Sequence, residues 1–152
     1  MVEYLKKLAP EKVKDARVWI GDYVWRVLSI DESEVLLIAE NVLGLHAFDD
    51  SVKGWVRDKL RTGVPDTDWE KFCDCLDWLT AEEAENLFSS DRDRVATNIE
   101  GTELWWWAST LSLWDKFRAI YVDGEVTRSG HYYTAQYGGV RPILRIPITT
   151  VS

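Results

Sequence analysis

The residue types best suited to molecular contact lie in the last third of the chain, in two stretches rich in aromatic side chains. Tyrosine, tryptophan and histidine offer rigid area that is part apolar and part polar, at a low cost in conformational entropy. The stretches are 109–118 and 128–137, and the second is bounded by glycines. They form either a ligand surface or a tyrosine-rich cover over the core. We expect a ligand surface built from Trp114, Arg118, His131, Tyr132, Tyr133 and Tyr137.

Catalytic chemistry finds little support in the sequence. A Ser-His-Asp triad needs a nucleophile, a base and an orienting carboxylate within hydrogen-bond reach. Ser129, His131 and Asp123 supply these types, but nearly any chain of this length permits such a choice. No Gly-x-Ser-x-Gly, His-Glu-x-x-His or P-loop motif is present. We therefore predict that the protein is not an enzyme, and a hydrolase using His131 is the weakest hypothesis.

Metal and disulfide chemistry is not indicated by the spacing of possible ligands. The only cysteines, Cys73 and Cys75, would point away from each other on a helix. No nearby histidine or cysteine completes a zinc set. Close acidic pairs are typical of helix caps and solvated turns. These pairs are Asp49 with Asp50 and Asp91 with Asp93. We predict no metal and no cofactor.

The net charge of the chain limits the kinds of partner that we expect it to bind. The 152 residues include 18 basic and 26 acidic side chains, a formal net charge of −8. Nucleic-acid binding generally needs a basic surface that displaces counterions, so we expect no nucleic-acid partner. The excess is concentrated at 66–103, where 12 acidic and three basic residues leave a net −9. That segment is either a solvated helical face or a docking face for a basic partner.

Hydrophobic composition predicts a folded domain without a membrane segment. Apolar residues make up 46% of the chain, enough to offset chain entropy. No run approaches the roughly 18 apolar residues of a membrane helix. No signal-peptide pattern follows the N-terminal lysines. We expect no membrane insertion and a cytoplasmic location, unless the sequence is part of a larger exported protein.

The elements that must position these residues follow from hydrophobic periodicity. Residues 1–16 predict a helical extension, and 17–152 predict a single domain. The alternation over 17–39 is typical of a hairpin, in which Gly21-Asp22 is a turn or bulge. The extension and the hairpin thus precede the helical part of the chain.

The middle of the chain predicts two to three helices. One is expected over 52–60 and a weaker one over 68–76. Thr80 and Glu83 form a capping-box pattern, which predicts a third helix that stops near 89–91.

The last third predicts an antiparallel sheet. Strands are expected over 104–107, over 119–122 with 125–127, and over 140–148. Because side chains alternate along a strand, Trp106 must face away from Trp105 and Trp107. Pro142 and Pro147 must lie at strand ends or edges. Strands, then helices, then strands predict an α+β fold.

Six short motifs follow one another over residues 17–146. They are Gly21–Leu28 with Leu36–Ile38, Ser51–Val56, Leu79–Arg94, Trp105–Thr110, Tyr121–Val126 and Gly139–Leu144. In this order they resemble a bacterial and phage domain family of unknown function, DUF 6273. In the fourth motif the family prefers Leu, Arg and Pro where this chain has Trp107, Ala108 and Thr110. The role of the family arginine is therefore absent here or supplied elsewhere.

The resemblance implies a C-type-lectin-like fold, as in formylglycine-generating enzymes and the variable proteins of diversity-generating retroelements. In such proteins the loops between late strands form the ligand surface. The cysteine pair of the oxidase branch is not matched, because Cys73 and Cys75 fall in the helical part. Arg141, in the closing motif, is expected to be structural and to bind a carboxylate or backbone carbonyls.

Two hypotheses of function follow. The first is a non-catalytic binding domain that recognises a protein or glycan ligand through the aromatic-rich loops. The second is an intracellular inhibitor or interaction protein, such as a phage-encoded one, that uses the acidic 66–103 face against a basic partner. Exposed tryptophans would equally suit a homo-oligomer, so the oligomeric state stays open.

Overall fold

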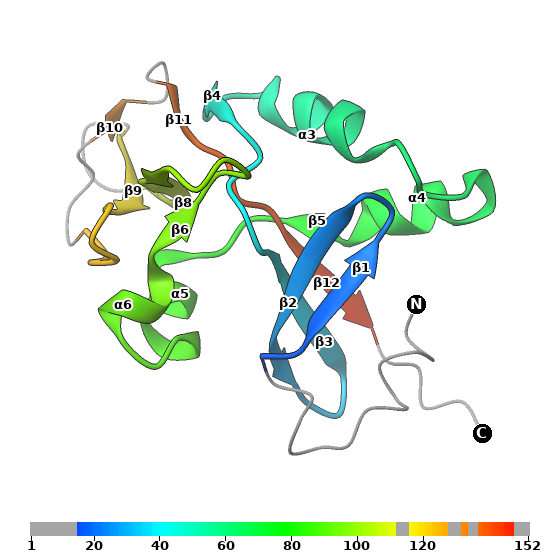
Figure 1. Cartoon of the computed structure of the whole chain (residues 1–152), viewed down its shortest axis with the longest axis horizontal. Coiled ribbons are helices and arrows are strands. Elements are labelled where there is room, and N and C mark those ends of the chain that lie inside the picture. Colours follow the sequence, from blue (N-terminus) through cyan, green and yellow to red (C-terminus); the bar gives the residue numbers. More distant parts are fainter. Residues whose placement is uncertain (1–14, 112–115, 128–131, 134–136, 148–152) are drawn as a thin grey trace.

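Two five-stranded sheets dominate the computed structural model, which describes residues 15–111, 116–127, 132–133 and 137–147 (Figure 1). The strands are β1 (Arg17–Ile20), β2 (Tyr23–Ile30), β3 (Glu34–Ala39), β4 (Leu45–Ala47), β5 (Leu76–Asp77), β6 (Ala96–Thr97), β7 (Glu103–Leu104), β8 (Trp106–Leu111), β9 (Lys116–Ile120), β10 (Tyr132–Tyr133), β11 (Tyr137–Gly139) and β12 (Ile143–Pro147). The helices are α3 (Val52–Leu60), α4 (Asp66–Cys75), α5 (Ala81–Leu87) and α6 (Asp91–Arg94). Together they form one α+β domain, which confirms the predicted class.

The first sheet has the order β1-β2-β3-β12-β5 and contains the predicted hairpin. β1 and β2 pair antiparallel around Gly21, whose φ of +59° lies in the left-handed region that favours glycine. β12 pairs with β3 on one side and β5 on the other. The prediction that this last strand belongs to the late sheet is therefore wrong. Ile143, Leu144 and Ile146 are buried on both faces of β12, so the strand needs an interior position.

The second sheet has the order β10-β9-β8-β11-β4. β8 and β9 pair antiparallel, but β11 pairs in parallel with β8 at Gly139 and Trp106. The late sheet is thus not purely antiparallel, which corrects the prediction. Glycine at 138 and 139 permits this crossing, because a Cβ on Gly138 would lie 2.0 Å from the Trp105 ring. A Cβ on Gly139 would lie 2.2 Å from the Trp105 carbonyl oxygen.

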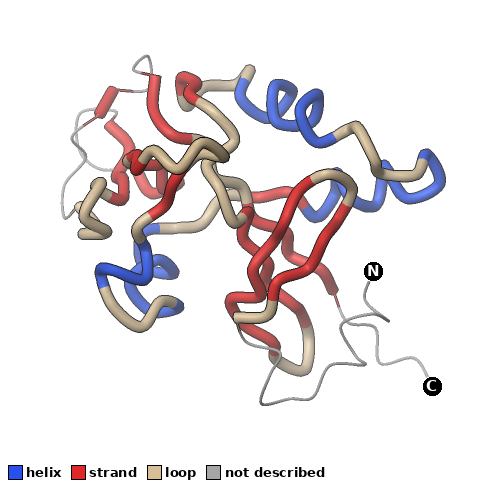
Figure 2. The backbone as a smooth tube through the Cα atoms, in the orientation of Figure 1, coloured by secondary structure: helices blue, strands red, loops and turns tan. Residues whose placement is uncertain are grey.

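The helices flank the strands in two pairs, α3 with α4 and α5 with α6 (Figure 2). α3 has the predicted bounds, and the capping box of Thr80 and Glu83 is present at the start of α5. The short helix α6 was not predicted. Most of the predicted helix over 1–16 lies outside the described residues. Within the described part of the chain, every helix is too short and too polar to cross a bilayer.

Consecutive tryptophans of the second sheet enter two different parts of the core. Trp107 packs into a cluster with Trp25, Phe48 and Phe72, whereas Trp106 packs into one with Phe88 on the opposite side. Both Trp106 and Trp107 are buried. The predicted alternation is confirmed, and core covers both faces of β8 at this point. The rings of this region are therefore held by packing from several elements.

Candidate functional site

The six residues predicted to bind a ligand have different positions. Trp114 and His131 lie outside the described residues. Tyr132 and Tyr133 form β10, whose backbone pairs with β9 in the register Tyr132 with Phe117. Part of the second predicted loop is therefore an added edge strand beside β9.

Arg118 and Tyr137 make contacts within the protein. The Arg118 guanidinium donates to the Thr127 carbonyl and pairs with Glu85 at 3.5 Å. Tyr137 is 67% exposed, and its ring stacks on His46 at 5.8 Å between centroids. His46 in turn lies 5.2 Å from the ring of Trp55. Of this pair, Tyr137 presents a surface that a ligand could reach, whereas the cation of Arg118 already has partners.

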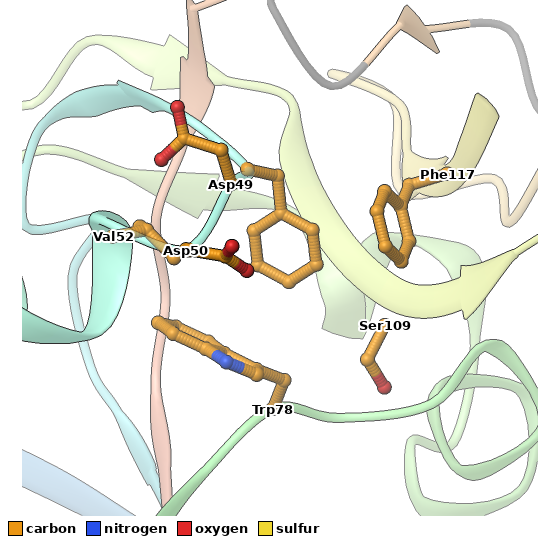
Figure 3. A pocket seen from close by; sticks show the side chains of 7 residues that line it. Asp49, Asp50, Val52, Trp78, Ser109 and Phe117 are labelled. Atoms are coloured by element: carbon orange, nitrogen blue, oxygen red, sulfur yellow. The ribbon is translucent and has the colours of Figure 1, made fainter. Parts of the chain in front are cut away.

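One concave site is a cavity of about 510 Å³ with aromatic walls, which we call the aromatic cavity (Figure 3). It lies where the entry to α3, the connection before α5 and the β8–β9 hairpin meet. Its volume falls in the range of small-ligand sites, roughly 300–1,000 Å³. Its lining residues are Phe48, Asp49, Asp50, Val52, Trp78, Ser109 and Phe117.

Phe48 contacts both of the other aromatic rings that line the cavity. Its ring centroid lies 4.7 Å from that of Phe117 with the planes at 90°, and 5.2 Å from that of Trp78 with the planes at 72°. On another side it stacks on Trp107 at 5.4 Å. The three rings of the cavity thus face different directions, and Trp78 and Phe117 are only half-buried. Ring area in this arrangement stays available to a ligand.

Hydrogen bonds to the second sheet hold the segments that carry these rings. The Trp107 indole Nε1 donates to the His46 carbonyl at 3.1 Å, which fixes the chain just before Phe48. The Ser109 amide donates to the Leu79 carbonyl at 3.0 Å, next to Trp78. The cavity is therefore preformed by the fold rather than built on a free loop.

The two carboxylates at the rim have different environments. Asp49 accepts hydrogen bonds from the hydroxyl and the amide of Ser51 at 2.6 and 2.9 Å, and these bonds lower the pKa of Asp49. Its role as a turn residue before α3 is confirmed. Asp50 is exposed and forms no hydrogen bond or ion pair with any described residue. Figure 3 shows the Asp50 carboxylate directed into the cavity, and that of Asp49 directed away from it.

Elsewhere in the molecule, aromatic rings already carry an internal cation. Arg61 lies 4.7 Å from the Trp69 ring centroid, and Lys59 lies 4.8 Å from that of Trp55. The same contact recurs deeper in the fold. There Arg141 lies 5.0 Å from the ring of Trp106, and Arg26 lies 5.2 Å from that of Phe88.

The aromatic cavity lacks such a contact. Within the described ranges, no cation lies over Phe48, Trp78 or Phe117.

Arg26 and Arg141 form a buried arginine cluster with their carboxylate and carbonyl partners. Arg26 bonds to Asp15 at 2.7 Å and to Asp93 at 2.9 Å. Burial raises the pKa of Asp93, but the bonds from Arg26 and Ser89 outweigh it and lower the pKa to about 2. Arg141 donates to the Ala39 carbonyl at 2.7 Å, which confirms its structural role. Burial lowers the pKa of Arg141 to about 10, so it stays charged near neutral pH.

The acidic segment 66–103 is partly neutralised by arginines. Six of its 12 acidic residues form ion pairs. They are Asp66 with Arg61, Asp77 and Glu83 with Arg145, Glu85 with Arg118, Asp91 with Arg94, and Asp93 with Arg26. The remainder, which forms no ion pair within the described ranges, includes Asp68, Glu70 and Asp74, which are exposed on α4.

Other kinds of site have less support. A second cavity of about 380 Å³ lies near Asn41 and Asn98, but the Asn41 amide already donates to Thr97 and to the Asn98 carbonyl. The described ranges contain no group of three or more potential metal ligands. Of the triad considered above, Ser129 and His131 lie outside the described residues.

The sequence did not single out the aromatic cavity. Phe48, Trp78 and Phe117 come from segments far apart in the chain, and each looks like an ordinary core residue. In the sequence, Asp50 and Asp49 together have the pattern of a helix cap. The only signal was indirect, since Ser109 and Phe117 lie at the two ends of the predicted contact loop 109–118. Comparison with known proteins adds no assignment, because no family model, curated protein or solved structure matches the chain.

Proposed function

We propose that this chain is a non-catalytic binding domain of the C-type-lectin-like kind, which recognises a protein or glycan ligand. The observation that carries the proposal is the aromatic cavity, which has a volume of about 510 Å³, ring faces, and at its rim a carboxylate that no described residue pairs with. Half-buried aromatic side chains in a preformed concavity are typical of recognition sites. The order of the sequence motifs supports the lectin-like part of the proposal.

The proposal modifies the surface expected from the sequence. The cavity takes Ser109 and Phe117 from the first predicted loop, and β10 of the second loop lies beside β9. Phe48 and Trp78 are added from the other side. The contact region therefore centres on the β8–β9 hairpin and extends toward the start of α3.

Binding of peptide and oligosaccharide arrays tests this function. We expect the wild type to retain at least one ligand and Trp78→Ala to bind it about thirtyfold more weakly or worse, because truncating an aromatic hot spot costs at least about 2 kcal/mol of binding free energy. Trp19→Ala is the matched control, since Trp19 is 69% exposed on β1, the edge strand of the first sheet. Equal retention by wild type and a folded Trp78→Ala variant would contradict the proposed site.

A second candidate function is an inhibitor or interaction protein that uses the acidic face. Its specific support is the exposed, unpaired trio Asp68, Glu70 and Asp74 on α4. Such binding should weaken steeply with salt. An array ligand kept by Trp78→Ala but lost when these three are changed to their amides would favour this function over the first.

A further inference from the structure

We infer that the aromatic cavity receives a cationic side chain, lysine or arginine, presented by a protein partner. This inference rests on the proposed binding function and names the chemistry of its ligand. It uses three features of the cavity: an unpaired carboxylate, ring faces in several directions, and the lack of an internal cation among the described residues.

The carboxylate sets the sign of the ligand's charge. Asp50 has no partner among the described residues, and Figure 3 shows its carboxylate directed into the cavity that Phe48 and Trp78 also line. A neutral glycan that covers this carboxylate would leave its charge uncompensated, which costs free energy. An ammonium or guanidinium would pair with it and form charge-assisted hydrogen bonds.

The rings favour the same ligand. The face of an aromatic ring carries partial negative charge, so a cation over the half-buried ring of Trp78 or Phe117 is attracted. The Trp78 ring is inclined at 72° to the Phe48 ring, and the Phe117 ring at 90°. Trp78 and Phe117 can therefore contact one bound group from different sides. The aliphatic stem of lysine or arginine would meanwhile pack on the apolar wall near Val52.

Other partly or fully buried aromatic rings of this chain contact a cation from the chain itself. Trp55, Trp69, Phe88 and Trp106 each lie within 4.7–5.2 Å of an internal lysine or arginine. The rings of the aromatic cavity have no such partner within the described ranges, although they have a carboxylate beside them. The missing component of the arrangement is the cation, and a partner would supply it.

Calorimetric titration with three peptides tests the inference. They share the sequence acetyl-Gly-Ser-X-Ser-Gly-amide, in which X is lysine, arginine or norleucine, the uncharged analogue of the lysine stem. We expect the wild type to bind the lysine or arginine peptide at least about tenfold more tightly than the norleucine peptide. Asp50→Asn should remove at least about fivefold of that preference.

Asp58→Asn is the matched control, because it changes net charge equally at an exposed residue of α3 that does not line the cavity. It should leave the peptide affinities within about twofold, and melting curves confirm that both variants are folded. An equal loss in Asp58→Asn would attribute the effect to overall charge and overturn the inference.

The remaining outcomes separate this inference from the proposed function. Equal binding of all three peptides, weakened throughout by Trp78→Ala, would keep the cavity as a binding site but overturn the cationic ligand. Tighter binding of tetramethylammonium than of any peptide would replace the protein partner with a small quaternary amine. No binding of any charged peptide would overturn the inference, and the array experiment would still decide the proposed function.

Discussion

Two regions of this molecule bring aromatic rings and charged groups together with opposite results. In the buried arginine cluster, Arg26 and Arg141 lie over Phe88 and Trp106, and carboxylates or carbonyls accept hydrogen bonds from most of their donors. Arg141 Nη1 is buried without a hydrogen-bond partner among the described residues. In the aromatic cavity the rings surround open space, and the charge at the rim is negative. The first arrangement takes its cations from within the chain. On the inference drawn above, the second receives its cation from a partner.

The difference shows that burial determines whether aromatic rings and charged groups stabilise the fold or stay available for binding. Buried charges are costly in free energy, and the hydrogen bonds and ion pairs of most donors in the arginine cluster offset that cost. Exposed Asp50 carries little such cost, since water solvates it. Groups in the cluster should therefore control stability, whereas groups in the cavity should control binding with small effects on stability. The following variants test that division, in order of expected effect.

Trp106→Ala should be the most destabilising change. The side chain is fully buried, and its Nε1 donates to the Arg94 carbonyl at 3.1 Å. Truncation leaves a large void and removes the surface on which Arg141 rests, so we expect a loss of about 3–5 kcal/mol in the free energy of unfolding. Urea denaturation measures it. A loss below about 1 kcal/mol would show that the cluster does not control stability.

Asp93→Asn should lower the free energy of unfolding by about 1–2 kcal/mol near pH 7, because Arg26 loses a charged acceptor in a partly buried setting. The folded pKa of Asp93 is lowered to about 2 from its usual value of 3.8. Its contribution is therefore complete above about pH 4 and is lost as the pH falls from about 4 to 2. Unfolding curves across that interval should show a shallower pH dependence for Asp93→Asn. The same slope in both proteins would refute the assignment.

Trp78→Ala should have a smaller effect on stability, about 1–2 kcal/mol, although it removes a residue of the same type as Trp106. Trp78 is half-buried, and one of its contacts is the cavity itself. Chemical denaturation beside Trp106→Ala gives the comparison directly. Equal losses would mean that Trp78 is a core residue and that the two regions do not differ.

Asp50→Asn should have the smallest effect, within about 0.5 kcal/mol of wild type, because exposed substitutions without partners change stability little. Thermal melting detects the difference. A clear destabilisation would reveal a structural partner for this carboxylate and would argue against its role at an empty site.

Local features of this fold could be predicted from the sequence, because neighbouring residues determine them. The turn at Gly21, the bounds of α3 and the capping box of Thr80 with Glu83 all follow from short patterns. The opposite orientations of Trp106 and Trp107 follow from strand periodicity. Each of these features depends on a few consecutive residues, so the sequence alone was enough to predict it.

Long-range pairing could not be predicted in this way. β12 pairs with the N-terminal hairpin, an interior position that suits its apolar side chains on both faces. No local sequence pattern predicts which strand it pairs with. The cavity likewise combines Phe48, Trp78 and Phe117, which are about 30 to 40 positions apart. Asp50 resembles a helix cap in sequence, and only its lack of a described partner shows that Asp49 performs the local role.

Fluorine NMR on protein labelled with 5-fluorotryptophan tests most directly whether the cavity is filled from outside by a cation. The nine tryptophans give resolvable probes, and Trp78→Phe and Trp106→Phe assign the two signals of interest. Titration with the lysine peptide should shift the Trp78 signal and leave that of Trp106 unchanged, while the norleucine peptide should shift neither at the same concentration. An unmoved Trp78 signal, or equal shifts with both peptides, would contradict the account.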